Sequence, residues 1–298
     1  MGPSTHVYGA SRLVSFRRLC NLAKTVLIHR AVQGCKACKP LSVVDLGVGA
    51  GGDLTKWHRY RLHVFVGVDK DACRLEAARG RLAGLSTVGQ TGGVQSVRLV
   101  AMDLSQPSTS PNQWFESMLG RPASLGVSIV SVLLSLPLIL CGGPMTPALF
   151  VDHVDRLLAP GGIFVVMMSD TAIARQKLQI LPRATFGHFC LQQRTPNNKY
   201  AFKLPGGMWT EESMIDTPAL VQALKQKGYV SLLSDGAWWQ SAQEMVLRAE
   251  PRGLVAQWMG SRYVSDDDWM SLGFFGVLLC QKPTESESPT SQKSRGAS

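Results

Sequence analysis

A glycine-rich turn holds the residues with the clearest chemistry in this chain. The apolar run 41–46 leads into Gly47-Val-Gly-Ala-Gly-Gly-Asp53, and a segment with helical character follows. Glycine lets the backbone turn sharply and approach a ligand closely. Asp69 ends the next apolar run, where a carboxylate can accept both hydroxyl hydrogens of a ribose. The pattern predicts a site for a nucleoside-containing cofactor.

Two cofactors compete for this turn. Gly47 to Gly52 satisfies the Gly-x-Gly-x-x-Gly fingerprint of NAD-binding oxidoreductases. Asp45 gives the Asp-x-Gly-x-Gly form that is typical of methyltransferases, and a Pro-Gly-Gly turn within 157–164 is typical of them too. Asp53 would repel a pyrophosphate but could hold the ammonium of a methionine. The sequence therefore favours S-adenosylmethionine over NAD, and a turn without any ligand is the remaining alternative.

Alternating apolar segments must hold these residues in place. Apolar residues at helical or strand spacing mark the expected elements. Helices are predicted at 12–31, 53–60, 73–82, 148–158 and 218–227, and strands at 41–46, 64–68, 97–102, 127–133, 163–168, 229–233 and 274–280. This order predicts a parallel sheet with helices on both faces. Together with the methyltransferase features of the glycine turn, it leads us to expect a Rossmann-like α/β fold of the class I methyltransferase type, with a mostly parallel seven-stranded sheet.

Composition divides the 298-residue chain into parts. Residues 1–40 carry seven basic side chains and no acidic one, out of a net charge of +10, so we expect a basic N-terminal helix and arm that favours a polyanionic partner. A methyltransferase domain is expected over 41–282, with a surface insertion at 171–210 where charged, amide and aromatic residues mix. The polar residues 283–298 are expected to be a disordered tail.

Several classes of protein are disfavoured. Seven scattered cysteines imply no disulfide framework and fit a reducing compartment, the nucleus or the cytoplasm. Cys35-Lys-Ala-Cys38 is only half of a zinc site, so no metal is predicted. Residues 122–151 carry no charge, but Pro137 and a Gly-Gly-Pro break interrupt them, so no membrane span is expected.

Three segments resemble one enzyme family. Asp45-Leu-Gly-Val-Gly-Ala-Gly-Gly-Asp-Leu-Thr-Lys-Trp57 resembles the Asp-Leu-Gly-Cys-Gly-Lys-Gly-Gly-Asp-Leu-x-Lys-Trp segment of mRNA cap guanine-N7 methyltransferases. Asn21-Leu-Ala-Lys-Thr-Val-Leu-Ile28 is similar to that family's Asn-Trp-x-Lys-Ser-x-Leu-Ile helix, and residues 200–220 follow its later segment. The resemblance runs from about residue 12 to 282, and the chain resembles a divergent member of the family.

The resemblance implies a set of binding residues. Lys24 and Asp53 would lie near the methionine end of S-adenosylmethionine, Gly47 would pass under it, Asp69 would bind the ribose and Asp103 would lie near the adenine. The cofactor-binding residues expected from it are Lys24, Gly47, Gly49, Asp53, Asp69 and Asp103. Asp170, Glu212 and Phe275 are expected to bind the substrate.

The guanine side departs from the family. After the fourth strand the family has Gln and then His-Tyr, where this chain has Leu133 and then Pro137-Leu138. Pro205 stands where the family has a Glu, and Phe275 replaces a Tyr, which keeps an aromatic face and loses a hydroxyl. Apolar replacements in a hydrogen-bonded site should weaken selectivity for guanine.

The resemblance implies methyl transfer to guanine N7 of a 5′ RNA cap. N7 has a free lone pair, so we expect no catalytic residue beyond those that position the reactants. The fourth strand offers no acid that could activate a ribose hydroxyl, and the chain lacks the Asn-Pro-Pro-Tyr motif of amino-group methyltransferases. The alternative is a weak or inactive methyltransferase-fold subunit that binds RNA or a partner. Capped RNA is the expected partner, with room for a capping-complex protein, and the divergence alone suggests a viral source.

Overall fold

The computed structural model describes residues 5–35, 40–86, 93–106, 116, 119, 126–140, 143–194, 199–204, 208–249 and 265–284. The chain forms two compact units that alternate along the sequence. The glycine-turn unit comprises Leu27–Val166, Asp216–Trp238 and Leu278–Ser298. The antiparallel-sheet unit comprises Met1–Val26, Met167–Ile215 and Trp239–Val277.

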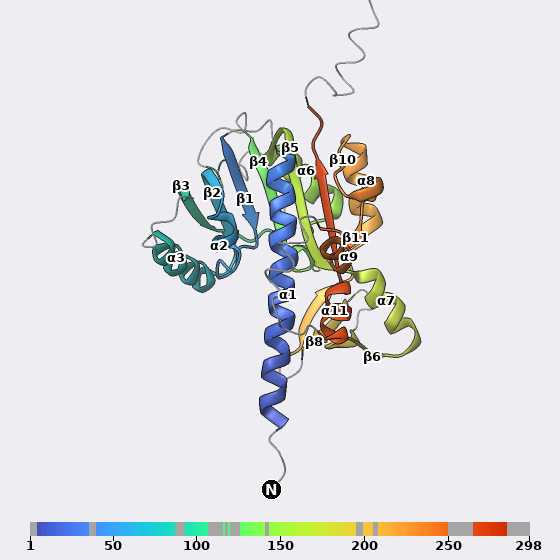
Figure 1. Cartoon of the computed structure of the whole chain (residues 1–298). Coiled ribbons are helices and arrows are strands. Elements are labelled where there is room, and N and C mark those ends of the chain that lie inside the picture. Colours follow the sequence, from blue (N-terminus) through green and yellow to red (C-terminus); the bar gives the residue numbers. More distant parts are fainter. Residues whose placement is uncertain are drawn as a thin grey trace, which may run out of the picture. The chain divides into compact units, whose positions relative to one another are not determined.

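A mostly parallel sheet forms the centre of the glycine-turn unit (Figure 1). Its strands follow the order β10-β12-β5-β4-β1-β2-β3. A short eighth strand, β11, pairs with the beginning of β12, and the residues of this pairing belong to the antiparallel-sheet unit. The strands are β1 (Leu41–Leu46), β2 (Arg61–Asp69), β3 (Gly93–Ala101), β4 (Val127–Leu133), β5 (Leu158–Ser169), β10 (Val230–Ser231), β11 (Gln240–Ser241) and β12 (Phe275–Gln281). β1 runs parallel to β2 and β4, β2 runs parallel to β3, and β12 is antiparallel to β10 and β11. The predicted α/β class is confirmed.

Burial explains why the central strands were readable from sequence. Every residue of β1 and of β4 is buried, as expected for strands covered on both faces, and such strands appear as continuous apolar runs. Both were predicted with their observed bounds. β3 lies at the edge of the sheet and is largely exposed.

Helices of the glycine-turn unit pack on this sheet and on one another. α3 packs against β2 and β3, and α6 packs against β4 and α8. The helices are α2 (Leu54–Trp57), α3 (Ala72–Ser86), α5 (Leu136–Ile139), α6 (Pro147–Leu157) and α8 (Thr217–Gln226), with the 3₁₀ turn η2 (Ser234–Gly236). Thr146 and Asp216 cap α6 and α8 by accepting backbone N–H groups, and each helix has Pro in its first turn.

The predicted insertion is a folded part of the antiparallel-sheet unit. A four-stranded sheet, β6 (Arg183–Phe186), β7 (Phe189–Arg194), β8 (Lys199–Lys203) and β9 (Thr210–Ser213), has the order β6-β7-β8-β9, and each neighbouring pair is antiparallel. The unit also contains α7 (Thr171–Ile180), α9 (Ala242–Leu247) and α11 (Asp266–Gly273). Phe189, Leu191 and Tyr200 are fully buried. The mixed polar and apolar residues here belong to strands with one buried face, and the assignment of 171–210 as an insertion stays a prediction.

Helix α1 (Thr5–Gly34) is longer than the predicted 12–31, and it continues from one unit into the other. Phe16, Leu19, Leu22, Ala23 and Val26 are buried, as their spacing predicts. The basic side chains differ in exposure. Arg17 and Arg18 are exposed and Arg30 is half-buried, while the Arg12 side chain, Lys36 and Lys39 lie outside the described residues.

Other predicted bounds also need correction. The predicted helix 53–60 is only Leu54–Trp57, and the strand predicted at 229–233 is only Val230–Ser231. β5 begins at Leu158 rather than 163, because the Pro-Gly-Gly segment lies in the strand, where the Lys282 amide donates to the Gly162 carbonyl at 2.8 Å. Among the described helices, none is long and apolar enough to cross a membrane.

Candidate cofactor and substrate site

The glycine turn is fastened to the end of the neighbouring strand. The amides of Gly47 and Val48 both donate to the Val68 carbonyl, at 2.7 and 3.0 Å. Gly47 has φ +81°, and a Cβ on it would lie 2.3 Å from Cβ and Oγ of Ser135. Only glycine fits at this position without a shift of the backbone.

The turn opens toward Asp69. Gly49 has φ +54°, and a Cβ there would lie 3.9 Å from Asp69 Oδ2 and 4.0 Å from Arg74 Nη1. Asp69 Oδ2 accepts the Gly49 amide at 2.8 Å, and its Oδ1 accepts the Asp71 amide at 3.0 Å. Each carboxylate oxygen has lone pairs left to accept another hydrogen bond. The half-exposed Asp69 side chain therefore has the acceptors that a ribose diol requires.

Asp103 follows the end of the adjacent strand. Asp69 pairs with Ala101 across the β2–β3 ladder, so the two carboxylates leave the same edge of the sheet. Asp103 Oδ1 accepts the Ser105 amide at 3.0 Å and the Ser105 hydroxyl at 2.7 Å. These hydrogen bonds hold the pKa of Asp103 below its usual range, so the exposed side chain is ionised.

Asp53 forms a buried ion pair that the sequence analysis missed. Lys56 Nζ lies 2.6 Å from Asp53 Oδ1, and both side chains are largely buried. Lys56 stands three residues after Asp53, the spacing at which helical side chains meet, so the signal was present in the sequence. The predicted contact of Asp53 with a methionine ammonium stays a prediction.

Asp45, which favoured a methyltransferase over a dehydrogenase, has a structural partner. Its carboxylate is buried, and Oδ1 accepts the hydroxyl of Ser131 at 2.7 Å. Ser131 lies opposite Asp45 in the β1–β4 ladder. Asp45 therefore joins the two central strands just before the glycine turn.

The other predicted residues belong to the antiparallel-sheet unit. Glu212 is buried, and its Oε2 accepts the Ser169 hydroxyl at 2.5 Å and the Tyr200 hydroxyl at 2.7 Å. Burial raises the pKa of Glu212 above its usual range, although the two donors act in the opposite direction. Lys24 is half-buried in α1, and its role at the cofactor stays a prediction.

Asp170 has a partner for each carboxylate oxygen. Oδ1 caps α7 by accepting the Ala172 amide at 2.9 Å, and Oδ2 accepts Trp239 Nε1 at 2.8 Å. The Asp170 amide donates to the Phe274 carbonyl at 2.7 Å. The side chain is half-exposed, so the remaining lone pairs of its carboxylate can accept further donors.

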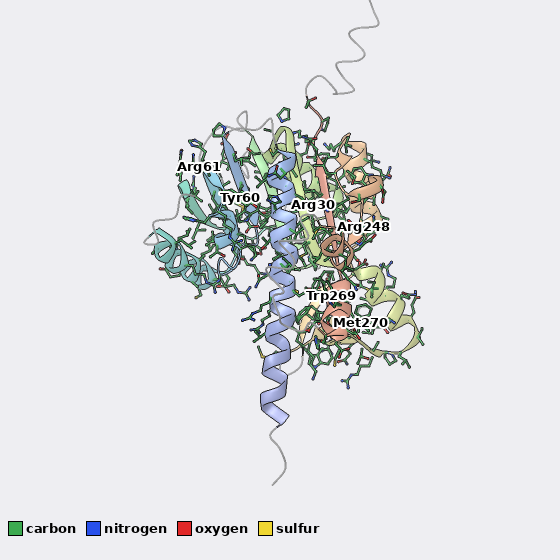
Figure 2. All side chains as sticks on the ribbon, in the orientation of Figure 1. Arg30, Tyr60, Arg61, Arg248, Trp269 and Met270 are labelled. Carbon is green, nitrogen blue, oxygen red and sulfur yellow. The ribbon has the colours of Figure 1, made fainter. Side chains whose placement is uncertain are left out.

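Phe275 lies in an aromatic cluster. Its ring stacks on Phe16 with centroids 6.3 Å apart and meets Phe189 edge to face at 5.7 Å. The residue is 8% exposed. Its packing is that of a core aromatic, and stacking on a cap stays a prediction. Trp269 lies half-buried on α11 (Figure 2).

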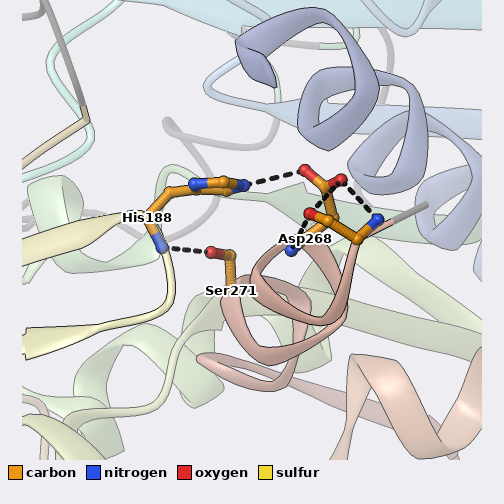
Figure 3. Close-up of polar contacts among 4 residues, drawn as sticks. His188, Asp268 and Ser271 are labelled. Carbon is orange, nitrogen blue, oxygen red and sulfur yellow. Dashed lines mark hydrogen bonds and ion pairs between the residues drawn. The ribbon is translucent and has the colours of Figure 1, made fainter. Parts of the chain in front are cut away.

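A buried polar pair joins the β6–β7 turn to α11 (Figure 3). His188 Nε2 lies 2.9 Å from Asp268 Oδ1, and the His188 amide donates to Ser271 Oγ at 2.7 Å. Asp268 Oδ2 also accepts the amide of Ser265, which completes a capping box at the start of α11. Sequence analysis did not find this pair, since 80 residues separate its members.

The guanine-side replacements follow β4. Leu133 and Pro137 are buried and Leu138 is 44% exposed. Leu134, between them, has φ +73°, which is a strained conformation for a non-glycine residue. Pro205 lies outside the described residues.

A pocket of about 440 Å³ occurs elsewhere in the glycine-turn unit. Its lining includes Pro40, Leu41, Tyr60 and Arg61, the last two of which are labelled in Figure 2. Leu41 and Arg61 begin β1 and β2, so the pocket lies at the amino ends of these strands. Open α/β sheets bind ligands at the carboxyl ends of their strands. The glycine turn, Asp69 and Asp103 lie at that edge and form the better cofactor site.

Known proteins agree with this assignment. A family model described as the mRNA (guanine-N(7))-methyltransferase domain matches residues 5–218. An African swine fever virus mRNA-capping enzyme is 23% identical over 249 residues, which are 76% of this chain and 28% of that protein. The Arabidopsis thaliana mRNA cap guanine-N(7) methyltransferase 1 is 36% identical over 75 residues, 25% of this chain and 19% of the relative. The chain thus spans less than a third of either relative's length.

Solved structures support the fold. An S-adenosylmethionine-dependent methyltransferase from Clostridium acetobutylicum matches with a TM-score of 0.51 and 11% identity, covering 90% of this chain and 92% of its own. Geranyl diphosphate methyltransferase in complex with S-adenosylmethionine matches with a TM-score of 0.50 and 13% identity, covering 94% and 92%. The cofactor of this fold and family is S-adenosylmethionine, and Asp69 beside the glycine turn has the hydrogen-bond acceptors that a ribose requires. The family match covers well over half of the chain, which therefore belongs to the mRNA (guanine-N(7))-methyltransferase domain family.

Proposed function

We propose that this chain transfers a methyl group from S-adenosylmethionine to guanine N7 of a 5′ RNA cap. The observation that carries the proposal is the family match over 5–218, which includes both the glycine turn and Glu212. The geometry of the turn supports the cofactor half of the reaction.

The residues at the carboxyl edge would hold the cofactor. When bound, S-adenosylmethionine would supply an electrophilic methyl group, to which a lone pair can bond while the carbon–sulfur bond breaks and the sulfur leaves as a thioether. Asp69 would accept the ribose hydroxyls, and the bare Gly47 and Gly49 would let the backbone approach the ligand. Asp103 is ionised and could accept a donor of the adenine.

The guanine requires positioning but no base. Its N7 lone pair is free, so no proton has to leave before attack, and proximity and orientation can supply most of the acceleration. Guanine also presents N–H donors on its opposite edge, which a carboxylate can accept. Asp170 and Glu212 are the carboxylates that we assign to the cap, with Phe275 as a neighbouring aromatic.

The packing of these groups bears on selectivity. Glu212 already accepts two hydroxyls, and Phe275 already stacks on Phe16. Leu133 and Pro137 offer no side-chain hydrogen bond to guanine. We therefore propose poorer discrimination among cap analogues than a fully hydrogen-bonded site would give. These same residues favour the second candidate, a weak or inactive subunit that binds RNA or a capping partner.

A methyl-transfer assay tests the proposal. Purified chain and radiolabelled S-adenosylmethionine would be incubated with GpppG-capped RNA and with the same RNA lacking a cap. We expect label in the capped RNA alone, and much less label with Asp69→Ala. Binding of S-adenosylhomocysteine without transfer to capped RNA would instead support the inactive-subunit alternative. We place the reaction in the nucleus or the cytoplasm, where capped RNA occurs.

A further inference from the structure

The antiparallel-sheet unit gathers three cationic side chains around one tryptophan ring. Arg183 Cζ and Arg194 Cζ each lie 5.8 Å from the ring centroid of Trp209, and Lys203 Nζ lies 5.1 Å from it. The cations come from β6, β7 and β8, which are neighbours in the sheet. We call these four residues the Trp209 cation cluster.

Strand register places the three cations on one face of the sheet. Arg183 pairs with Gln192, which lies two residues before Arg194, and Lys203 pairs with Cys190, two residues before Gln192. Residues paired across a ladder, or two apart along a strand, share a face.

The opposite face is the one that packs into the core. Phe189, Leu191 and Tyr200, which alternate with the residues of the first face, are buried. Arg183 is exposed, and Arg194 and Lys203 are half-buried. The face that bears the cations is therefore the accessible one.

The positive charge of this cluster is not neutralised within the described residues. No ion pair there joins Arg183, Arg194 or Lys203 to a carboxylate, whereas Lys199 on the same face is paired with Glu211 at 3.2 Å. Arg194 Nε is buried and has no hydrogen-bond partner in the described part of the chain. The Trp209 ring attracts each cation, but three like charges also repel one another. An anion at the accessible ends of these side chains would relieve that repulsion.

We propose that the Trp209 cation cluster binds the phosphates of single-stranded RNA, the chain that follows the cap of the substrate. Neighbouring strands lie about 4.8 Å apart, so β6 to β8 span roughly 10 Å. A row of phosphates along an RNA chain can meet cations that come from strands spread over this width. The net charge of +10 favours the same polyanion. Trp209 acts as a positioning residue that holds the cations together. The inference rests on the proposed function only in taking RNA as the occupant.

Binding of short uncapped single-stranded RNA, followed by fluorescence anisotropy over a range of salt, tests this assignment. The triple variant Arg183→Gln, Arg194→Gln, Lys203→Gln should lower affinity about 10- to 100-fold at low salt. The slope of log K against log salt should fall by about two units, at roughly 0.7 for each lost phosphate contact. Trp209→Ala should weaken binding several-fold, and Trp209→Phe should restore most of it because a ring remains. RNAs of different sequence should bind alike, since phosphates carry no sequence.

A matched control separates the cluster from net charge. In the glycine-turn unit, Lys225 Nζ lies 5.6 Å from the ring centroid of Trp238. Among the described residues, no second cation lies over the Trp238 ring. Lys225→Gln should leave RNA binding nearly unchanged, and Lys203→Gln should weaken it. An equal loss from both, or a wild-type salt slope in the triple variant, would overturn the inference.

Two further measurements keep the test decisive. Calorimetry with S-adenosylhomocysteine should give wild-type affinity for each variant, which shows that the cofactor site is intact. If the triple variant does not fold, the single variants decide. Methyl transfer to the cap dinucleotide GpppG, which has no RNA chain, should persist in the variants. Its absence in the wild type would defeat the proposed function, while the RNA salt slopes would still decide the role of the cluster.

Discussion

Replacing Asp69 with alanine removes the acceptor at the centre of the cofactor site. The carboxylate accepts the Gly49 amide at 2.8 Å and the Asp71 amide at 3.0 Å, and in the complex it would also accept the ribose hydroxyls. Loss of the ribose acceptor costs about 1–3 kcal/mol, and loss of the bond that shapes the turn costs about 0.5–1.5 kcal/mol. Together they give about 1.5–4.5 kcal/mol, or roughly a 10- to 1,600-fold weaker Kd at about 1.4 kcal/mol per tenfold.

Isothermal titration calorimetry with S-adenosylhomocysteine measures this loss directly. Asp69→Asn should be intermediate, because one oxygen still accepts. Asp71→Ala is the matched control, because the exposed Asp71 carboxylate accepts the Arg74 amide and pairs with the Arg74 guanidinium. It should reduce stability slightly, as loss of a helix cap does, and leave Kd unchanged. Wild-type affinity in Asp69→Ala, or an equal loss in Asp71→Ala, would refute the assignment of Asp69 to the ribose.

Three other predictions concern the turn, α1 and the buried carboxyl. Gly47→Ala should abolish S-adenosylhomocysteine binding and lower the free energy of unfolding by more than about 2 kcal/mol, because the added Cβ would lie 2.3 Å from Ser135. Gly52→Ala is the control, since its Cβ would have its nearest contact at 3.8 Å, and it should change little in the same titration and urea melt. Replacing the exposed Arg17 and Arg18 with Ala should lower the slope of log K for RNA against log salt by about one to two units and leave cofactor affinity unchanged. An unchanged slope would show that this face of α1 does not contact RNA. The pKa of Glu212 is raised by burial, so the folded state binds the Glu212 proton more tightly than the unfolded state does. The free energy of unfolding should therefore fall as the pH rises above the usual pKa of 4.5. Glu212→Gln should flatten that fall in urea melts, and an equally steep fall in the variant would contradict the prediction.

The carboxyl edge of the sheet was largely predictable from sequence. The buried strands β1 and β4 are continuous apolar runs, so their bounds could be read directly, and Asp69 and Asp103 follow apolar runs that end nearby. Carboxyl ends of neighbouring parallel strands meet at one edge, which brings these side chains together without any knowledge of loops.

The antiparallel sheet was not predictable in the same way. Its strands are four to six residues long and have one buried face, so polar and aromatic residues alternate and resemble a surface loop. The pairing of His188 with Asp268 depends on packing between segments that are distant in sequence. Aromatic packing also decides the surroundings of Phe275, because Phe16 lies on another element altogether. Residue type alone could not tell a stacking platform from a core side chain.

Mapping the methylated atom tests the central claim most directly. Capped RNA would be incubated with the chain and S-adenosylmethionine, digested to nucleosides and cap dinucleotides, and analysed by mass spectrometry against authentic 7-methylguanosine standards. We expect the added methyl group only on N7 of the cap guanine. A methyl group on a ribose or an internal base, or none on RNA from a chain that binds S-adenosylhomocysteine, would contradict the proposed activity.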